Sequence, residues 1–511
     1  MKIFSAAQLH KADEATTKKH NITQLELMEH AGTQIFNWLH QRMQGAQVPI
    51  HIFCGIGNNG GDGLVVGRKL MEAGYNVEMY VANFTDKRSK CFLINYDRVK
   101  SSTKKWPKLM MSAEDFPEIN PEDILIDALF GIGLNRPPEG WVKKLIQYLN
   151  EQKSFKLSID IPSGLYPDQA LEDAEAVIKA NHTLTFQSPK LAFFLPETGK
   201  FVPYYEVIDI GLDAEYLQKT ESIAQLISKQ EVQQFYKQRE KFSHKGMYGH
   251  ALIVAGSYGK IGASVLSARA ALRSGAGLVT AFVPECGYEV LQASIPEVMV
   301  LTDTEDDLIT DISYDFEPSV IGVGPGIGTK KETVTALKKL FSETKVPFVI
   351  DADALNCIAE NESVMKVLPK NSILTPHPGE LKRLIGDWTD DYDKLEKTKK
   401  FSEEKEVIVL IKGAHSIAVV GKQLYINNTG NPGMATGGSG DVLTGMITGL
   451  VAQGYDALLA TLFGTYLHGR AGNMVAETKG FEALIASDII EYIGDAYLDL
   501  FAQPEQEPQQ Q

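Results

Sequence analysis

The sequence predicts an α/β protein made of two doubly wound domains, and three observations lead to this fold class. The chain has 511 residues, which exceeds the size at which one hydrophobic core stops growing. In both halves, short apolar strands are followed by glycine-rich turns and helical runs, a pattern that favours parallel sheets. Between the halves lies a polar, helix-prone run, DAEYLQKTESIAQLISKQEVQQFYKQREK. We therefore expect domains at residues 1–222 and 223–502, followed by a disordered tail at 503–511.

The composition disfavours several classes of protein. With 65 acidic and 50 basic residues the net charge is −15, which argues against a general nucleic-acid or membrane surface. The four cysteines lie far apart and form no C-x-x-C pair, so neither a zinc site nor a disulfide framework is indicated. The N-terminal MKIFSAAQLHKADE reaches charged residues too early for a secretory signal. We expect a cytoplasmic enzyme that acts on small molecules, binds neither nucleic acid nor membrane, and forms a homo-oligomer.

The first domain opens with helical segments that continue to about Met43, with apolar residues on one face. A βαβ unit follows: the strand IHIFCG, the glycine-rich loop Gly55–Gly63, the helical run LVVGRKLMEAG and the strand NVEMYVA. In a parallel sheet this loop lies at the carboxyl ends of the strands, which is where open α/β sheets bind ligands.

The glycine-rich loop has three interpretations. A G-x-G-x-x-G pattern begins at Gly55, and Glu78 lies at about the right distance for a ribose contact, but this match alone is weak. The oxygen-bearing side chains of Asn58, Asn59 and Asp62 suit a hard cation or a polar substrate. The same side chains also suit a turn that satisfies its own backbone.

Two later strand ends favour a ligand site over a simple turn. ILIDALFGIGLNRP brings Asp127 to the end of a strand, and LSIDIPSG brings Asp160 and Ser163 to the end of another. Three parallel strand ends would bring these side chains and Asn59 toward one cleft. Two carboxylates in one cleft need a charge partner or a role in proton transfer.

This half resembles the NAD(P)H-hydrate epimerase family, through the motifs LMEHAG, CGIGNNGGDGLVVGRKL, DALFGIGL and DIPSG. The resemblance implies a Rossmann-like domain that interconverts the R and S hydrates of NADH and NADPH. It assigns Asp160 as a catalytic residue and Asn59, Asp127 and Ser163 as ligands of K+. Ile132 stands where the family carries threonine. The residues implied to bind the hydrate are Asn58, Asn59, Gly60, Gly61, Asp62, Gly131, Ile132, Gly133, Leu134, Asn135, Arg136, Pro137 and Asp160.

The second half predicts another doubly wound sheet. The strands HALIVAGS, LVTAFV, SVIGVG, PFVIDAD, SILTP and VIVLIKG alternate with helical segments. Three of them end in the corners GVGPGIG, TPHPGE and KGAHS, which would face one cleft.

The stretch NPGMATGGSGDVLTG precedes an apolar helical run. Its glycines Gly437, Gly438 and Gly440 allow backbone N–H groups to converge at a helix N-terminus, an arrangement that binds an oxyanion or a phosphate. Asp441 would then lie in the first turn as a candidate base. The simpler alternative is a glycine-rich turn capped by Ser439.

These motifs, together with HKGMYGHALIVAGS, GASVLSARAALRSGAGLV and DADALN, resemble the ribokinase-like fold and, more closely, the ADP-dependent NAD(P)H-hydrate dehydratase family. The resemblance implies that the nucleotide converts the ring hydroxyl into a phosphate ester. The ring nitrogen then expels phosphate, which restores NAD(P)H and leaves AMP when ADP is the donor. Asp441 is the implied catalytic residue, and we expect Mg2+ to arrive with the nucleotide. The implied contacts are Ala263, Gly324, His377 and Asp441 for the hydrate, and Lys412, Gly413, Ala414, His415, Ser416 and Gly440 for the nucleotide.

The preferred hypothesis is a bifunctional repair enzyme that epimerises the hydrates NADHX and NADPHX and dehydrates the S epimer with ADP. A second hypothesis is a ribokinase-like small-molecule kinase, because GGSGD suits phosphoryl transfer to any alcohol. A third keeps the first half as a non-catalytic binding module, because fold alone does not determine function.

Overall fold

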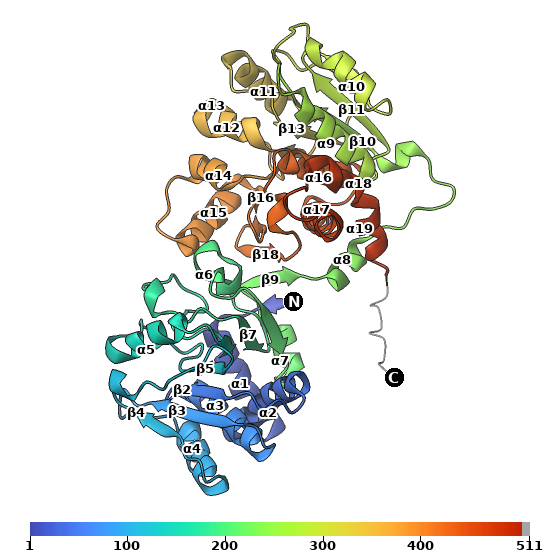
Figure 1. Ribbon diagram of the computed structural model, residues 1–511. Coiled ribbons are helices and arrows are strands. Elements are labelled where there is room, and N and C mark those ends of the chain that lie inside the picture. Colours follow the sequence, from blue (N-terminus) through green and yellow to red (C-terminus); the bar gives the residue numbers. More distant parts are fainter. Residues whose placement is uncertain (503–511) are drawn as a thin grey trace. The chain divides into compact units, whose positions relative to one another are not determined.

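The computed structural model describes residues 1–502, which form two compact units (Figure 1). The N-terminal unit contains Lys2–Ala224 together with Asp390–Tyr392. The C-terminal unit contains Met1, Gln225–Thr389 and the chain from Asp393 onward. The tail that the sequence predicts to be disordered, at 503–511, lies outside the described residues.

The N-terminal unit is built on one seven-stranded sheet in which all neighbouring strands are parallel. In order across the sheet, the strands are β4 (Lys108–Met110), β3 (Val77–Ala82), β2 (Ile50–Cys54), β5 (Ile124–Ala128), β6 (Phe155–Ile159), β7 (His182–Phe186) and β8 (Tyr205–Ile208). A further strand, β1 (Lys2–Ile3), opens the chain. The strand order changes direction between β2 and β5, which creates the crevice where such sheets bind ligands.

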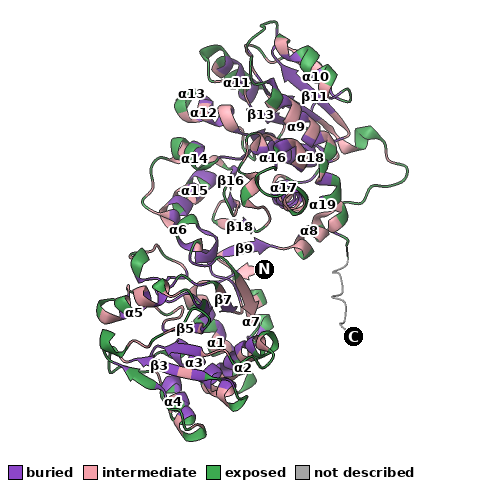
Figure 2. Ribbon diagram, viewed as in Figure 1, coloured by how far each residue is buried: buried purple, intermediate pink, exposed green. Residues whose placement is uncertain are grey.

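Helices cover both faces of this sheet, as the alternation of its buried residues requires. Ile52 and Cys54 belong to an apolar cluster with helices α2 (Gln24–Met43) and α3 (Asn58–Glu72). Phe53, on the opposite face of the same strand, packs in a cluster with α5 (Gly140–Glu151). Figure 2 shows the strands buried between these layers. The other helices are α1 (Ala6–His20), α4 (Lys90–Ser102), α6 (Pro196–Gly199), α7 (Ala214–Lys219), and the 3-10 turns η1 (Ala113–Asp115), η2 (Ala174–Ala176) and η3 (Leu191–Phe194).

The glycine-rich segment after β2 is the first part of a helix, so its prediction as a loop up to residue 63 is wrong. Helix α3 begins at Asn58, and its glycines face its neighbours. A Cβ at Gly61 would lie 2.7 Å from Sδ of Met28, and one at Gly63 would lie 2.6 Å from Cβ of Ala128. Glycine therefore serves here for close packing of α3 on α2 and the sheet.

The C-terminal unit contains a larger, mixed sheet. In order across it, the strands are β12 (Met299–Thr302), β11 (Leu278–Val283), β10 (His250–Val254), β13 (Val320–Val323), β14 (Phe348–Ile350), β15 (Ile373–Leu374), β16 (Ile408–Ile411), β17 (Ile417–Val420), β18 (Gln423–Asn427) and β9 (Ala224–Ile227). The strands from β12 to β16 are parallel, whereas β17 is antiparallel to both its neighbours. The strand order changes direction between β10 and β13.

Two helices, α9 (Ile261–Arg273) and α16 (Ser439–Ala452), pack unusually closely beside this sheet. A Cβ at Gly445 would lie 2.1 Å from the carbonyl oxygen of Ser267, and one at Gly449 would lie 2.5 Å from that of Ala271. The remaining helices are α8 (Lys229–Phe235), α10 (Tyr288–Ser294), α11 (Lys331–Glu343), α12 (Ala352–Glu360), α13 (Glu362–Met365), α14 (Pro378–Ile385), α15 (Asp391–Lys405), α17 (Ala457–Lys479), α18 (Ala486–Glu491), α19 (Ile493–Asp499), and the turns η4 (Lys245–Tyr248), η5 (Glu285–Gly287) and η6 (Pro432–Met434).

The composition of the polar run between the halves predicts helix, but the run is not helical throughout. Its apolar AQLI segment forms β9, in which Leu226 and Ile227 are buried and pair in parallel with β18. Pairing with an existing strand outweighs local helix propensity here. None of the helices within residues 1–502 is long and apolar enough to cross a membrane.

Candidate active sites

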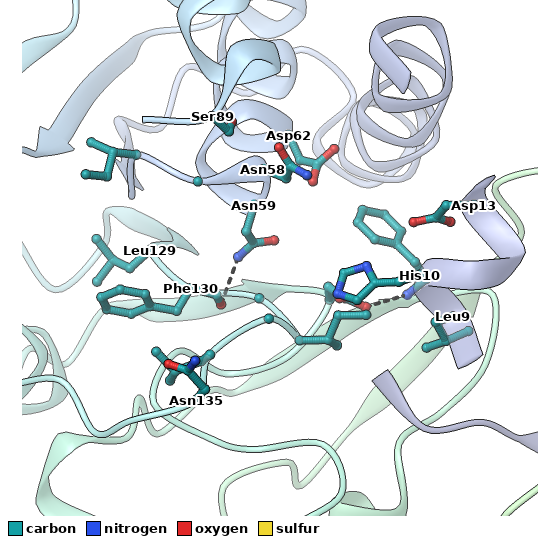
Figure 3. Close-up of a pocket in the computed structure, with 18 of the residues that line it drawn as sticks. Leu9, His10, Asp13, Asn58, Asn59, Asp62, Ser89, Leu129, Phe130 and Asn135 are labelled. Atoms are coloured by element: carbon teal, nitrogen blue, oxygen red, sulfur yellow. Dashed lines mark hydrogen bonds between the residues drawn. The ribbon is translucent and has the colours of Figure 1, made fainter. Parts of the chain in front are cut away.

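The N-terminal unit contains a cavity of about 510 Å3 at the carboxyl ends of β2 and β5, where the strand order changes direction. We call it the N-terminal cavity. Figure 3 shows side chains from α1, from the start of α3 and from the segment after β5 converging on it. Of the residues implied to bind the hydrate, those that line it are Asn58, Asn59, Asp62, Gly131, Ile132, Gly133, Leu134, Asn135, Arg136 and Asp160.

Three residues implied to bind the hydrate do not line the cavity: Gly60, Gly61 and Pro137. A Cβ at Gly60 would lie 1.8 Å from the carbonyl oxygen of Gly55, so this glycine lets α3 approach the end of β2. Glu78, the candidate ribose contact, also lies outside the cavity lining and forms ion pairs on the sheet edge instead.

Asp160 is held rigidly at the cavity wall. It follows β6 directly and has a φ of 67°, a left-handed conformation that is uncommon for a residue other than glycine. Its Oδ1 lies 2.9 Å from Nζ of Lys190 and accepts a hydrogen bond from the backbone N–H of Phe186 at 3.1 Å. The Lys190 side chain is 0 % exposed. Such strain persists only where the surroundings enforce it, and it is concentrated at functional sites.

Two further carboxyl groups share this cavity with Asp160. Burial raises the pKa of Asp13 to about 7, with a further contribution from the negative charge of Asp160. Burial also raises the pKa of Asp62 well above its ordinary value, and Asp160 and Asp13 add to that increase. Lys190 lines the same cavity and pairs with Asp160, and the cationic side chains of Lys87 and Arg136 also belong to the lining.

The sequence did not single out Asp13, His10 or Lys190, all of which line the cavity. For Lys190 a signal existed, because SPK follows a strand end at the same sheet edge as Asp127 and Asp160. For the α1 residues none existed, since a polar residue on an amphipathic helix usually faces solvent.

The three residues implied to hold K+ are linked by hydrogen bonds: Asn59 and Ser163 contact Phe130, and Asp127 contacts Ser163. Phe130 donates its N–H to Oγ of Ser163 at 2.8 Å, and its carbonyl accepts from Nδ2 of Asn59 at 3.0 Å. The buried Asp127 accepts from the Oγ and N–H groups of Ser163 at 2.5 and 2.9 Å. These contacts bring together carboxylate, amide, hydroxyl and carbonyl groups, whose oxygens are the ligands that hard cations prefer. The donor set therefore fits a potassium ion.

In the C-terminal unit, α16 begins within the glycine-rich stretch, as the sequence predicts. Gly438 is its N-cap residue with φ 87°, and Asp441 lies in the first turn. Burial raises the pKa of Asp441 to about 7, and the nearby Asp351 adds to the increase while Lys412 opposes it. A carboxyl group with a pKa near neutrality suits a general base. We call the surroundings of this helix start the α16 site.

A buried ion pair borders the α16 site and includes a residue that sequence reasoning gave no role. Nζ of Lys412 lies 2.6 Å from Oδ1 of Asp351, and Thr444 in α16 donates to Oδ2 of Asp351 at 2.7 Å. Asp351 is 1 % exposed and belongs to the DADALN motif at the end of β14. A Cβ at Gly440 would lie 3.3 Å from Nζ of Lys412, so Gly440 and Lys412 adjoin.

The other strand ends of the C-terminal unit meet at the same place. A Cβ at Gly324, whose φ is 127°, would lie 1.9 Å from the carbonyl oxygen of Asp351, and Gly326 lies beside Ala263 of α9. Lys412 donates its backbone N–H to the carbonyl of Pro376 at 3.0 Å, which joins the TPHPGE and KGAHS corners. The structure thus brings Ala263, Gly324, Lys412, Gly440 and Asp441 to one sheet edge, with Gly413, Ala414, His415 and Ser416 directly after β16.

His377 has a structural role in the described chain. It is the N-cap residue of α14: its Nδ1 accepts from the N–H of Gly379 at 2.9 Å, and its own N–H donates to Glu380 at 2.8 Å. Its side chain is half exposed. Burial raises the pKa of Glu380, which Lys412 opposes. His415 is half-buried, and this burial lowers its pKa.

The fold and the two sites define a bifunctional α/β enzyme, with one small-molecule site at the carboxyl edge of each sheet. Two family models match the chain: a YjeF-related protein N-terminus at residues 24–192, and NAD(P)H-hydrate dehydratase at residues 251–495. A bifunctional NAD(P)H-hydrate repair enzyme of Moorella thermoacetica is 35% identical over 96% of both chains. One of Escherichia coli is 30% identical over 95% of this chain and 92% of its own. The chain belongs to the family of bifunctional NAD(P)H-hydrate repair enzymes.

Solved structures similar to the chain include the ADP/ATP-dependent NAD(P)H-hydrate dehydratase of Bacillus subtilis, co-crystallised with ATP and Mg2+. It is 26% identical, covers 54% of this chain and 99% of its own, and has a TM-score of 0.48. A yeast protein, ynu0, is 19% identical over 43% of this chain and 93% of its own, with a TM-score of 0.38.

Proposed function

We propose that this chain interconverts the R and S epimers of hydrated NADH and NADPH, and dehydrates the S epimer to NAD(P)H with ADP as phosphoryl donor, releasing AMP and phosphate. One observation carries the proposal. Each unit places acid–base carboxyl groups at the carboxyl edge of its own sheet, as the two consecutive reactions of the family require. The substrates are therefore NADHX or NADPHX and a nucleotide.

In the N-terminal cavity, Asp160 acts as the carboxylate that takes or returns a proton at the oxygen carried by the hydrated ring carbon. The fixed backbone and the Lys190 ion pair support this role, because they hold the carboxylate in one place. Asn58, Asn59 and the residues Gly131–Arg136 line the space available for the nicotinamide ring and its ribose.

Asn59, Asp127 and Ser163 would hold K+ beside this cavity, with the carbonyl of Phe130 among its ligands. Burial raises the pKa of Asp127, whose hydrogen-bond donors are hydroxyl and amide groups. A bound cation would supply the missing positive charge and would help to order the segment after β5.

At the α16 site, Asp441 removes the proton of the ring hydroxyl, whose oxygen attacks the terminal phosphorus of ADP while AMP departs. Backbone N–H groups at Gly438–Gly440 and the Lys412 ammonium stabilise the charge on the transferred group. The lone pair of the ring nitrogen then breaks the bond between carbon and the ester oxygen, phosphate leaves, and loss of a ring proton restores the double bond. Ala263, Gly324 and His377 are proposed contacts of the hydrate.

Mg2+ would enter the α16 site on the nucleotide phosphates and neutralise part of their charge. Within residues 1–502, no three His, Cys, Asp or Glu side chains come together as a metal-binding group. We also propose a cytoplasmic, symmetric homo-oligomer, a state that light scattering of the purified chain would test.

The test is the return of reduced-nicotinamide absorbance from a fresh mixture of both NADH-hydrate epimers with enzyme, ADP, Mg2+ and K+, within a time too short for spontaneous epimerisation. Full recovery is expected. Recovery of the S epimer alone would leave the N-terminal unit as a binding module. No recovery with ADP or ATP, combined with a stable phosphorylated alcohol from a substrate screen, would favour a small-molecule kinase.

A further inference from the structure

Helix α1 brings a second acid–base group to the N-terminal cavity. Asp13 lies in α1, lines the cavity and also borders an adjoining cavity of about 200 Å3. In Figure 3, His10 and Asp13 extend from α1 toward the space that Asn58 and Asp62 enter from the start of α3. Asp160, in contrast, enters from the sheet edge. The two carboxyl groups therefore come from different elements of the cavity wall.

Burial makes the largest contribution to the raised pKa of Asp13, and the charged groups around it contribute the rest. Asp160 and the neighbouring Glu14 are negative and favour the protonated form of Asp13, while Lys190 opposes them. Asp62 on α3 is coupled to both Asp13 and Asp160. The Lys190 ammonium, however, is committed to Asp160 at 2.9 Å, to Thr185 Oγ1 at 2.8 Å and to the carbonyl of Ser188 at 2.9 Å.

This arrangement divides the carboxyl groups into three kinds. Asp160 is the member that pairs with the Lys190 ammonium. Asp62 is enclosed, and burial raises its pKa well above the ordinary value, which favours its protonated form. Asp13 is half-buried, so solvent reaches it, and its pKa of about 7 lets it exchange a proton at neutral pH. Asp13 is thus the member suited to proton transfer.

The chemistry of epimerisation requires two such groups. The hydrated carbon carries both the hydroxyl and the ring nitrogen, so the nitrogen lone pair can form a carbon–nitrogen double bond as the hydroxyl leaves. A carboxylic acid must protonate the hydroxyl so that it departs as water. When water adds to the other face of the cation, a carboxylate must accept its proton and the electron pair returns to nitrogen. The net change is one inverted centre and one proton moved between two carboxyl groups.

We propose that Asp13 is the second catalytic residue of epimerisation: it protonates the departing hydroxyl while Asp160 accepts the proton of the entering water, and the two exchange roles in the reverse direction. This inference rests on the proposed epimerase function of the N-terminal unit. It identifies a helix residue that lies outside the glycine-rich and strand-end motifs of the sequence.

The test compares the full-length wild type with Asp13→Asn in two assays on the same sample. The first measures conversion of the R epimer to the S epimer, and the second measures dehydration of pure S epimer with ADP and Mg2+. We expect Asp13→Asn to lose about 100-fold or more in epimerisation, with dehydration unchanged. The matched control is Asp97→Asn, which alters an exposed aspartate on α4 and should leave both rates unchanged.

The pH profile separates catalysis from a structural effect. The wild-type rate of epimerisation should lose activity on both sides of neutrality, because one carboxyl group must be protonated and the other ionised. Residual activity of Asp13→Asn should lack the limb near pH 7. Asp13→Glu, which retains an ionisable group, should restore that limb. With aspartate carboxyl carbons labelled with 13C, one resonance that titrates near pH 7 in the wild type should be missing from Asp13→Asn.

The outcomes are distinguishable. A wild type that does not interconvert the epimers refutes the proposed epimerase function itself. A wild type that does so, beside an equally active Asp13→Asn with the same pH profile, refutes only the role of Asp13. If Asp13→Asn does not fold, Asp13→Ser takes its place in both assays. A wild type without a carboxyl resonance that titrates near pH 7 and is lost in these variants also overturns the proposal.

Discussion

Asp160 shows how one residue can be fixed both in position and in charge. Its left-handed backbone and the hydrogen bond from the N–H of Phe186 orient the carboxylate, and the buried Lys190 ammonium lies 2.9 Å from it. Removing water from such a pair costs energy that the ion pair offsets only when its geometry is good. A structural residue at this position could avoid the cost as asparagine or glycine. The combination is therefore better explained by a need for a charged acceptor in the cavity.

Asp160→Asn should lower the rate of epimerisation about 100-fold or more, because an amide cannot accept a proton. Dehydration of the S epimer should be unchanged, since that site belongs to the C-terminal unit. The variant leaves the Lys190 ammonium buried without its carboxylate, which should destabilise the N-terminal unit by about 3 kcal/mol. The double variant Asp160→Asn, Lys190→Met should regain that stability in thermal unfolding without regaining activity. Epimerisation by Asp160→Asn at the wild-type rate would refute the assignment.

Asp441 has the corresponding role at the α16 site. Asp441→Asn should reduce dehydration by about 100-fold or more while epimerisation continues at the wild-type rate. Because the pKa of Asp441 is about 7, the wild-type rate should rise with pH through neutrality as the base ionises. The measurement is single-turnover formation of NADH from the S epimer across pH 5.5–8.5, a range chosen to bracket a pKa of roughly 7. A pH profile that falls over this range would contradict a base role.

The carboxyl group of Asp441 also makes the stability of the folded protein depend on pH. Its pKa is about 7 in the folded protein against an ordinary value of 3.8, so between these values the folded chain retains a proton that the unfolded chain has lost. The free energy of unfolding should therefore fall as pH rises from about 4 to about 7. Asp441→Asn should lack this part of the decline and be more stable than the wild type above pH 7, by on the order of 3 kcal/mol. Denaturant titrations at pH 5 and at pH 8 would measure the difference in stability between Asp441→Asn and the wild type, with Asp97→Asn as the control. The same difference at both pH values would contradict the raised pKa of Asp441.

Elements were predicted best where hydrophobic pattern and strand ends coincide. The strands that deliver Asp127 and Asp160 were predicted from short apolar runs, and the parallel sheet then places their carboxyl ends at one edge. The start of α3 was not predicted, because glycine propensity disfavours a helix and only close packing against Met28 explains it. Asp13 was missed because its function depends on how α1 docks, which no local pattern encodes.

The contact between α9 and α16 carries a prediction at the scale of elements. A Cβ at Gly445 would lie 2.1 Å from a backbone oxygen of α9, and backbone cannot move aside as a side chain can. Gly445→Ala should therefore destabilise the C-terminal unit by about 1–3 kcal/mol and displace the N-terminus of α16, lowering the affinity for ADP. Gly494→Ala, a helical glycine with open space at its Cβ, should be neutral or slightly stabilising. The measurement is the loss of dehydration activity of each variant on heating. Equal melting temperatures of the two variants would contradict the close packing of α9 and α16.

At the scale of the whole molecule, the chain joins two doubly wound folds that use one principle of site construction. Each has its candidate site at the carboxyl ends of parallel strands, beside the strand pair where the order changes direction. In each, a lysine pairs with a buried carboxylate: Lys190 with Asp160 in one and Lys412 with Asp351 in the other. The ligands expected at the two sites differ in charge, because the α16 site also takes the phosphates of ADP. The two activities should therefore require different cations.

This difference predicts that each activity depends on its own cation. The N-terminal cavity adjoins an oxygen-rich cluster around Asp127 that fits K+, whereas Mg2+ reaches the α16 site on the nucleotide. Replacing K+ with tetramethylammonium at constant ionic strength should therefore slow epimerisation and leave dehydration of pure S epimer unchanged. Removing Mg2+ with a chelator should stop dehydration while epimerisation in K+ continues. Asp127→Asn should weaken the dependence of epimerisation on K+, because the buried side chain is then neutral and has no charge for the cation to neutralise. Equal epimerisation rates in both monovalent salts would contradict the assignment of Asn59, Asp127 and Ser163 to a potassium site.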